Sequence, residues 1–271
     1  MQRTRCYISL LLLSLCWVLS SPDALAQSAP KYPLLEHFTN TPCVICASQN
    51  PGFFNRLEAY AGQYHHVSFW PGTPYTSCIF YQANIPENTA RKNYYLQVVG
   101  SPDVAINGVD FKSPSSVTNA VLDGLVGGTS WLSITVQETS GSTRDVTIDL
   151  QDHAGGSLSS GLLFAVVVEK EVMYNAPNGE TLHHNVFREF LTSTGGDAVD
   201  LSSGSASLSY QYTLDGGWQA DEIYVVAWLT AVGSKEVINS GTRFDEVVSG
   251  TRDIRGALPL RIYPNPASDY V

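Results

Sequence analysis

The sequence predicts an α/β domain over residues 32–126, followed by an all-β antiparallel sandwich domain over residues 129–245. In the first segment, short apolar runs typical of buried strands alternate with stretches in which apolar residues recur at helical spacing. Gly127-Gly128 marks a boundary between the two segments. Beyond it, apolar and polar residues alternate in runs separated by Gly, Ser and Asp, which favours antiparallel strands. With 271 residues, the chain is long enough for two hydrophobic cores.

The elements expected in the first segment follow the order strand, helix, strand, helix, strand, strand, helix. The strands are expected at 32–38, 64–70, 102–107 and 109–111, and the helices at 41–61, 88–98 and 113–125. Residues 71–87 are rich in Pro and Gly and are expected to be irregular. Asn107-Gly108 predicts a hairpin turn.

The second segment contains five apolar runs that predict strands. Three of them alternate with period two, and two are continuously apolar, as in strands that are buried on both faces. The alternating runs are Leu132/Ile134/Val136, Val146/Ile148/Leu150 and Leu208/Tyr210/Tyr212/Leu214, and the continuous ones are 162–168 and 223–232. Aromatic residues here are expected in the core or in cross-strand pairs, with Trp218 in the turn after Asp215 as a candidate contact residue.

Cys43 and Cys46 follow the first strand and lie at the start of the first expected helix. Asn40 and Thr41 offer capping oxygens, and Pro42 suits a first helical position because its missing N–H has no partner to lose there. A helix that starts there points free N–H groups at Cys43, which lowers the pKa of its thiol and makes it the expected nucleophile. Cys46 is one turn further on and can close a small disulfide with Cys43.

This pattern resembles thioredoxin-like domains, and Ser101-Pro102-Asp103 strengthens the resemblance. The resemblance implies that Pro102 follows a cis peptide bond, opens a strand that faces the two cysteines and presents its backbone to an extended substrate. It also implies a role for Glu36, which occupies roughly the place of a buried acid for proton transfer. A carboxylate that faces solvent at the strand end is the alternative for Glu36.

Residues 32–242 are also similar to the 28-kilodalton outer-membrane-protein-like family of Bacteroidota, which joins a thioredoxin-like domain to a β-rich one. The residues that carry this similarity are Glu36-His-Phe-Thr, Cys43-x-x-Cys46, Ala90-Arg91 with Tyr94-Tyr95, Ile106-Asn-Gly108 and His184-Asn-Val-Phe-Arg188.

Residues 1–26 have the features of a signal peptide. Arg3 and Arg5 precede an apolar core at 7–19, and Ala24-Leu-Ala26 provides a cleavage site. The protein is therefore expected to be exported, either secreted or held at the cell surface or outer membrane, with the periplasm as the alternative. After a linker at 246–260, residues 261–271 with Tyr263-Pro-Asn-Pro-Ala-Ser resemble the start of a C-terminal sorting domain, which implies the type IX secretion machinery as a partner.

Several classes of function are disfavoured. A net charge of −10 without a basic stripe argues against nucleic-acid binding. No segment after the signal peptide is long and apolar enough for a membrane helix. In each of the pairs His65-His66 and His183-His184, the two side chains point to opposite faces of a strand, so neither pair chelates a metal easily. No metal or other cofactor is therefore expected. Cys78 is interpreted as a buried apolar residue rather than a resolving thiol.

Two functions remain open from the sequence. The first is a thiol–disulfide oxidoreductase or redox-linked factor in which Cys43 attacks a protein disulfide, Cys46 resolves the intermediate, and Pro102 and Glu36 assist. The second is a non-catalytic adhesion or binding module at the cell surface, in which the cysteine pair is a fixed structural disulfide.

Overall fold

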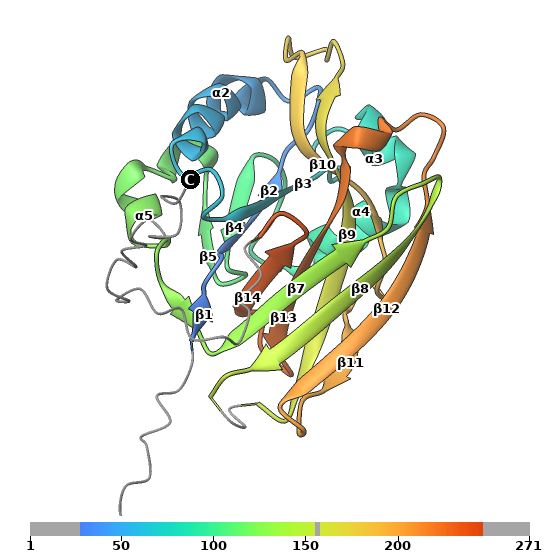
Figure 1. Ribbon diagram of the computed structural model, residues 1–271. Coiled ribbons are helices and arrows are strands. Elements are labelled where there is room, and N and C mark those ends of the chain that lie inside the picture. The colour runs from blue at the N-terminus through green and yellow to red at the C-terminus, as the bar shows by residue number, and fades with distance from the viewer. Residues whose placement is uncertain (1–27, 155–157, 246–271) are drawn as a thin grey trace, which may run out of the picture.

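The computed structural model describes residues 28–154 and 158–245 (Figure 1). The expected signal peptide at 1–26, the linker at 246–260 and the sorting motif at 261–271 lie outside these residues.

Short strands and helices make up the first segment, and long strands dominate the second. The elements of the first segment are β1 (Ala29–Pro30), β2 (Leu34–Phe38), α2 (Val44–Glu58), β3 (His65–Phe69), α3 (Ile79–Ala83), α4 (Ile85–Tyr94), β4 (Asp103–Ile106), β5 (Asp110–Lys112), η1 (Pro114–Ser116) and α5 (Asn119–Asp123). Those of the second are β6 (Thr129–Ser130), β7 (Leu132–Glu138), β8 (Thr143–Asp152), β9 (Ser160–Met173), β10 (Leu182–Phe190), β11 (Asp197–Asp200), β12 (Ser205–Thr213), η2 (Ala220–Glu222), β13 (Ile223–Ala231) and β14 (Val237–Thr242).

One large sheet runs through both predicted segments, in the order β14-β13-β9-β10-β3-β2-β4-β5, with β11 paired to β9. The junction lies between β3 and β10, which are parallel and meet at Ser68 and Val186. Ser68 Oγ also donates to the His184 carbonyl at 2.7 Å. The strands of the second segment therefore continue the sheet of the first across the boundary predicted at 127–128.

The second segment forms a sandwich because a smaller sheet, β12-β8-β7, packs on β9 and β13. Alternate residues of β13, such as Val225 and Ala227, point into this core. Their neighbours Val226 and Trp228 point to the opposite face and pack with a second core. Burial on both faces explains the continuously apolar runs seen in the sequence.

The helices cover the part of the large sheet that the small sheet leaves free. In Figure 1, α2 and α5 lie on the same side as the small sheet, and α3 and α4 lie behind. Adjacent residues of β2 divide between these sides: Leu35 packs with Phe53 of α2, whereas Leu34 packs with Tyr95, which follows α4.

Helix α2 begins at Val44, three residues later than expected. Cys43 is its N-cap, and the Cys43 sulfur accepts a hydrogen bond from the Cys46 N–H at 3.0 Å. The prediction that Asn40 or Thr41 caps the helix was wrong, because the Asn40 amide instead donates to the carbonyls of Pro71 and Tyr75.

The segment 71–87 is more regular than expected, since it contains α3 and the first turn of α4. The Asn84 side chain caps α4 by accepting from the Glu87 N–H. Pro86 lies in the first turn, where a backbone N–H is not needed. The helix expected at 113–125 is split into η1 and α5.

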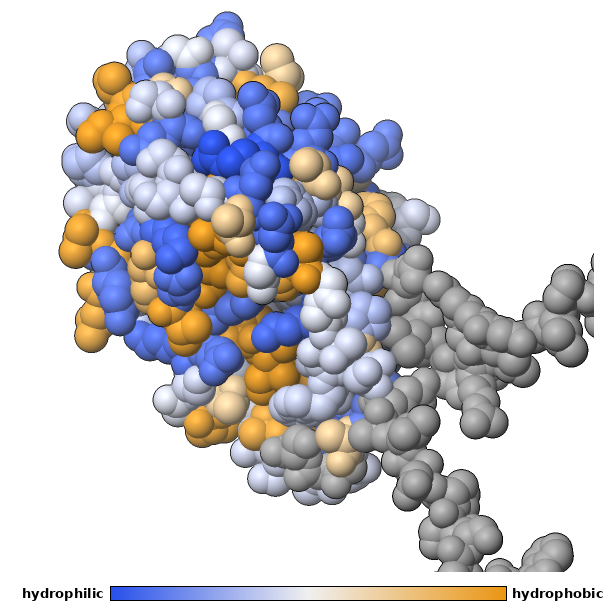
Figure 2. Space-filling view, turned by 90° about the vertical axis from the view of Figure 1, so that its left-hand side faces the viewer, coloured by the Kyte–Doolittle hydropathy of each residue, from blue (hydrophilic) through white to orange (hydrophobic). Residues whose placement is uncertain are grey.

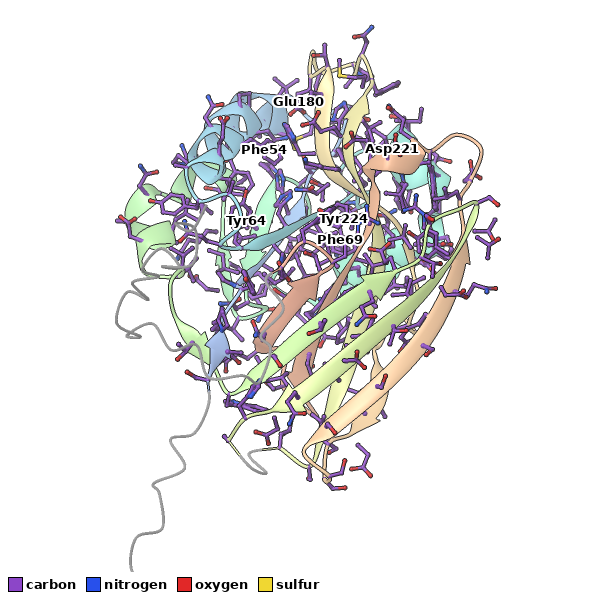
Figure 3. The ribbon with its side chains drawn as sticks, in the orientation of Figure 1. Phe54, Tyr64, Phe69, Glu180, Asp221 and Tyr224 are labelled. Atoms are coloured by element: carbon purple, nitrogen blue, oxygen red, sulfur yellow. A yellow bond between two sulfur atoms is a disulfide. The ribbon has the colours of Figure 1, made fainter. Side chains whose placement is uncertain are left out.

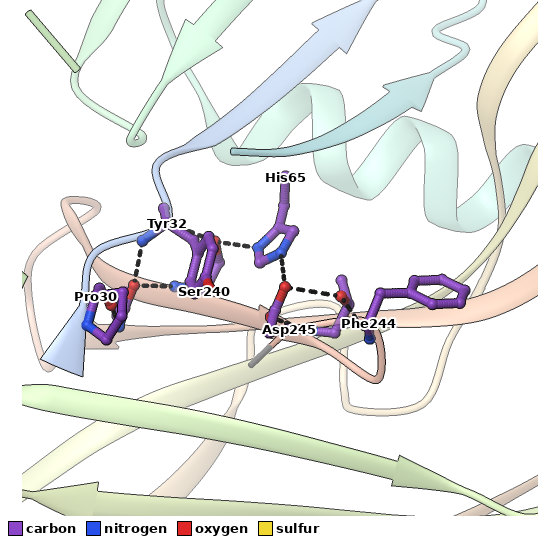
Figure 4. A network of polar contacts seen from close by, with 8 residues as sticks. Pro30, Tyr32, His65, Ser240, Phe244 and Asp245 are labelled. Atoms are coloured by element: carbon purple, nitrogen blue, oxygen red, sulfur yellow. Dashed lines mark hydrogen bonds and ion pairs between the residues drawn. The ribbon is translucent and has the colours of Figure 1, made fainter. Parts of the chain in front are cut away.

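Polar contacts join the start of the described chain to its end (Figure 4). His65 on β3 lies with Nδ1 2.7 Å from Ser240 Oγ and with Nε2 2.9 Å from Asp245 Oδ1. Ser240 Oγ donates to the Tyr32 carbonyl at 2.7 Å. These contacts join β14 and Asp245 to β3 and to the residues that precede β2.

Candidate functional site

The predicted cysteine pair is a disulfide at the N-terminus of α2. Cys43 and Cys46 are bonded, and their Cα atoms are 5.2 Å apart. Strand β2 ends at Phe38, and a turn closed by the hydrogen bond from the Cys43 N–H to the Asn40 carbonyl leads into the helix. The disulfide therefore lies at the positive end of the helix dipole, where a thiolate is stabilised when the bond is reduced.

The sulfurs lie just beneath an apolar tip. Cys43 is 3% exposed and Cys46 is fully buried, whereas the intervening Val44 and Ile45 are 70% and 59% exposed. Figure 2 shows the face that carries α2 and α5, where apolar side chains gather in several places among polar ones. Two exposed aliphatic side chains therefore form a small apolar surface beside the disulfide.

The loop before β4 lies against the disulfide. The peptide between Ser101 and Pro102 is cis, and the Ser101 carbonyl oxygen is 3.9 Å from Cys43 Sγ. The sequence resemblance implied this arrangement, and the geometry agrees with it. Pro102 is thereby brought together with Cys43 and Cys46.

Glu36 lies away from the cysteines. It is fully buried rather than facing solvent, and it points to the side of β2 that carries α4. Its carboxylate pairs with Arg91 Nε at 2.5 Å and accepts a hydrogen bond from the Tyr95 hydroxyl. Both carboxylate oxygens are therefore used within this cluster, and the structure does not bring Glu36 to the disulfide.

The tip of the hairpin between β9 and β10, residues 174–181, was not anticipated as part of the site. Asn178 donates from its side chain to the Cys43 carbonyl at 3.0 Å and from its backbone to the Thr41 carbonyl at 3.2 Å. Glu180 accepts at 2.7 Å from the Asn178 side chain and at 2.8 Å from Asn50 on α2. The sequence carries no signal for these contacts, because Asn178 is 135 residues away from Cys43.

Three histidines lie behind α2. Burial lowers the pKa of His37 to about 3, and burial with the two neighbouring histidines holds the pKa of His66 well below its usual value. Burial also lowers the pKa of His184, whose ring packs on Phe54 with centroids 4.3 Å apart. These rings are therefore neutral at pH 7.

Within residues 28–154 and 158–245, no group of three His, Cys, Asp or Glu side chains is placed to hold a metal ion. The two adjacent histidine pairs separate as expected for strands. His65 bonds to Ser240, whereas His66 contacts the Asn185 amide at 2.9 Å. His183 lies 3.0 Å from the Tyr174 carbonyl, on the side of β10 away from Phe54.

Cys78 is a buried free thiol packed with Trp70, Phe80 and Val186. The interpretation as a small apolar residue is confirmed by this surrounding. Trp218 is half-buried beside Arg188, with the guanidinium carbon 5.8 Å from the ring centroid.

Taken together, the two packed sheets and the disulfide at a helix start define a β-rich, disulfide-containing protein. The chain matches the sequence model described as "Outer membrane protein Omp28" over residues 87–243, which is more than half of its length. The chain belongs to the Omp28 family. This membership supports a location at the cell envelope or outer membrane. In the part of the chain that the structure describes, no helix is long and apolar enough to cross a membrane.

Of the similar solved structures, HBP35 and AGR_C_4864 share the fold at low sequence identity. HBP35 of Porphyromonas gingivalis is 17% identical with a TM-score of 0.67, and the match covers 81% of this chain and 78% of that one. Protein AGR_C_4864 from Agrobacterium tumefaciens is 13% identical with a TM-score of 0.50, over 82% of this chain and 98% of that one. A domain of the outer membrane lipoprotein Omp28 from Porphyromonas gingivalis is 18% identical with a TM-score of 0.32, over 42% and 86%. No curated protein matches the sequence.

Proposed function

We propose that this protein is an exported thiol–disulfide exchange protein of the cell envelope. In this proposal, residues 32–126 are a thioredoxin-like domain, residues 129–245 are a β-sandwich domain, and Cys43, Cys46 and Pro102 form the reactive site. The observation that carries the proposal is the Cys43–Cys46 disulfide at the start of α2, with the cis Ser101–Pro102 peptide against it. Glu36 is left out of the reactive site because it is committed to Arg91 and Tyr95.

The chemistry is the transfer of two electrons from a dithiol to a disulfide. A thiolate of the partner attacks Cys43 Sγ, the bond to Cys46 breaks, and the electron pair leaves on Cys46 Sγ. A second thiolate of the partner then attacks its own sulfur in the mixed disulfide and releases Cys43 as a thiolate. The partner becomes a disulfide, and this protein becomes a dithiol; the reverse sequence reduces a partner disulfide.

The residues around the disulfide support this role. The Cys46 N–H donates to Cys43 Sγ at 3.0 Å, and this donor favours a thiolate at Cys43. Val44 and Ile45 offer an apolar contact to a polypeptide partner. The Ser101 carbonyl lies 3.9 Å from Cys43 Sγ, and in this proposal the backbone of the Pro102 loop contacts an extended partner.

A second candidate is a non-catalytic surface adhesion or binding module in which the disulfide is permanent. The burial of both cysteines favours it, because a covered sulfur is reached slowly. For the same reason, a reductant is expected to cleave the Cys43–Cys46 bond slowly.

One experiment separates the two functions. The purified protein is equilibrated with glutathione buffers to measure the reduction potential of the pair, and its exchange with a fluorescent peptide disulfide is followed. An exchange protein gives a potential above about −300 mV and a rate that is abolished by Cys43→Ser. Cys78→Ser is the matched control, since it removes a buried thiol outside the site and should leave the rate unchanged. A potential below that range, with no exchange, would establish the permanent disulfide instead.

We also propose that residues 261–271 begin a sorting domain that the type IX secretion machinery reads. The motif Tyr263-Pro-Asn-Pro-Ala-Ser supports this. In a host with that machinery, deletion of residues 261–271 should hold the protein in the periplasm, whereas deletion of 250–260 should not. Equal release of both variants would contradict the proposal.

A further inference from the structure

A pocket of about 450 Å³ lies between α2 and the β9–β10 hairpin, beside the disulfide. It begins at Ala47, the residue after Cys46, and is closed on the other side by Asn178, whose side chain donates to the Cys43 carbonyl. Figure 3 shows Phe54 on the α2 side and Glu180 on the hairpin side of this region. The pocket therefore borders the disulfide through Ala47 and Asn178, although neither cysteine is among the residues that line it.

The walls of the pocket combine apolar side chains with polar ones, which include Asn55 and Thr181. Of the apolar side chains, Pro51 and Phe54 come from α2, and Leu182 comes from β10. Phe54 is fixed by its contacts with His66 and His184, at centroid distances of 5.4 and 4.3 Å. The apolar side chains suit the aliphatic stem of a long side chain, and the polar ones leave room for a charged end.

Glu180 is the charged residue that lines the pocket. Its two oxygens accept from Asn50 and Asn178, and these amides hold the carboxylate in place without neutralising it. Among the ion pairs of the described chain, none involves Glu180. Burial lowers the pKa of His184, so this ring adds no positive charge at pH 7.

We infer that this pocket is a subsite for a long cationic side chain, Lys or Arg, of the polypeptide that exchanges with the Cys43–Cys46 pair. This inference rests on the proposed function and defines its substrate class. The stem of such a side chain packs on Phe54, Pro51 and Leu182, and its charged end meets Glu180. The net charge of −10 also attracts a basic partner.

The position of the pocket limits where the cationic residue lies in the partner. Ala47 is adjacent to Cys46, and Phe54 is two helical turns, about 10 Å, further along α2. An extended chain advances about 3.4 Å per residue, so the basic residue is expected two or three positions away from the reacting cysteine.

The test uses the reduced protein and short peptides, each with one cysteine activated as a mixed disulfide with a small aromatic thiol. Cys43 displaces the aromatic thiolate, and Cys46 then attacks Cys43 Sγ and releases the peptide thiol. A peptide with Arg two residues from its cysteine should react about tenfold faster than the same peptide with Glu there. Glu180→Gln should reduce this preference to about twofold, whereas Glu58→Gln, the same charge change at the far end of α2, should preserve it. Salt should weaken the preference in the wild type.

A second measurement does not depend on redox chemistry. The oxidised protein is titrated with the fluorescent Arg and Glu peptides in which Ser replaces the cysteine. Tighter binding of the Arg peptide that Glu180→Gln removes supports the subsite, even if no peptide exchanges and the proposed function fails. Equal binding of both peptides, or a preference that survives in Glu180→Gln, overturns the subsite while leaving exchange intact.

Discussion

Glu36 and His37 are neighbours on β2, but they point to opposite faces of the large sheet and are buried by different means. The Glu36 carboxylate pairs with Arg91 and accepts a hydrogen bond from the Tyr95 hydroxyl. His37 is neutral at pH 7, because burial lowers its pKa to about 3. Its ring lies among those of Phe53, Phe54 and His66.

The face toward α4 is buried and closed to solvent around the Arg91–Glu36 pair. The Arg91 guanidinium lies within 6 Å of five ring centroids, which belong to Phe69, Tyr94, Tyr95, Phe164 and Trp228. The face toward α2 reaches the surface, because His184 on this face lines the pocket and packs on Phe54. Two adjacent residues of one sequence motif therefore have different roles. Glu36 helps to stabilise the core on one side of the sheet, and His37 lies behind the candidate site on the other.

The largest effect is expected from breaking the Arg91–Glu36 pair. Arg91→Met leaves a buried carboxylate without a cation, and this should lower the free energy of unfolding by about 3–5 kcal/mol. Chemical denaturation at pH 7 measures the loss.

Two further variants interpret that result. Adding Glu36→Gln to Arg91→Met removes the unpaired charge and should restore much of the stability. Lys112→Met removes a cation from the exposed pair with Asp110 and should change stability by less than about 1 kcal/mol. Similar losses for Arg91→Met and Lys112→Met would show that the stability of this face does not depend on the buried ion pair.

On the other face, acid should destabilise the protein through His37. In the unfolded chain this histidine takes up a proton near pH 6.5, whereas the folded protein resists protonation until about pH 3. Its contribution to stability is therefore complete above pH 6.5 and is lost as the pH falls through this window. The loss is about 1.4 kcal/mol per pH unit, or about 2 kcal/mol at pH 5.

The measurement is the free energy of unfolding at pH 7 and pH 5 for the wild type and His37→Gln. The variant should lose about 2 kcal/mol less than the wild type over this interval. His66→Gln should act in the same direction, because burial also lowers the pKa of His66. An unchanged pH dependence in both variants would mean that these rings do not stay neutral in the folded state.

A smaller effect is expected where the hairpin meets the disulfide. Asn178→Ala removes the hydrogen bond to the Cys43 carbonyl and should lower stability by about 1 kcal/mol. It should also speed the reduction of Cys43–Cys46 by dithiothreitol, because the hairpin then holds the loop less tightly. Asn175→Ala, at an exposed position of the same hairpin, is the control and should change neither quantity.

The sequence was most informative where chemistry and local spacing coincide. Cys43 and Cys46 are three residues apart at a strand–helix junction, so their pairing followed from local geometry. The strands with period-two or continuously apolar patterns were found because burial imposes those patterns on nearby residues. Helix starts were less accurate: Cys43 rather than Asn40 caps α2, since Asn40 is used by a loop 31 residues away.

Contacts between distant segments could not be predicted. The hydrogen bond of Asn178 to Cys43 and the bridge between Val186 and Ser68 join residues more than 100 positions apart. A single sequence contains no periodicity that reports such pairs. Glu36 illustrates the same limit, because its partner Arg91 is 55 residues away on the opposite side from the disulfide.

The ring of aromatic side chains around Arg91 has a consequence for how this chain can be divided. Phe164 and Trp228 come from β9 and β13, whereas Arg91 and Glu36 come from the first 126 residues. A fragment cut at residue 126 would open this enclosure to water and strip β3 of its partner β10. The two halves are therefore not expected to fold as independent modules that can be recombined with other proteins. Insertions or truncations are best placed at the chain ends rather than at Gly127-Gly128.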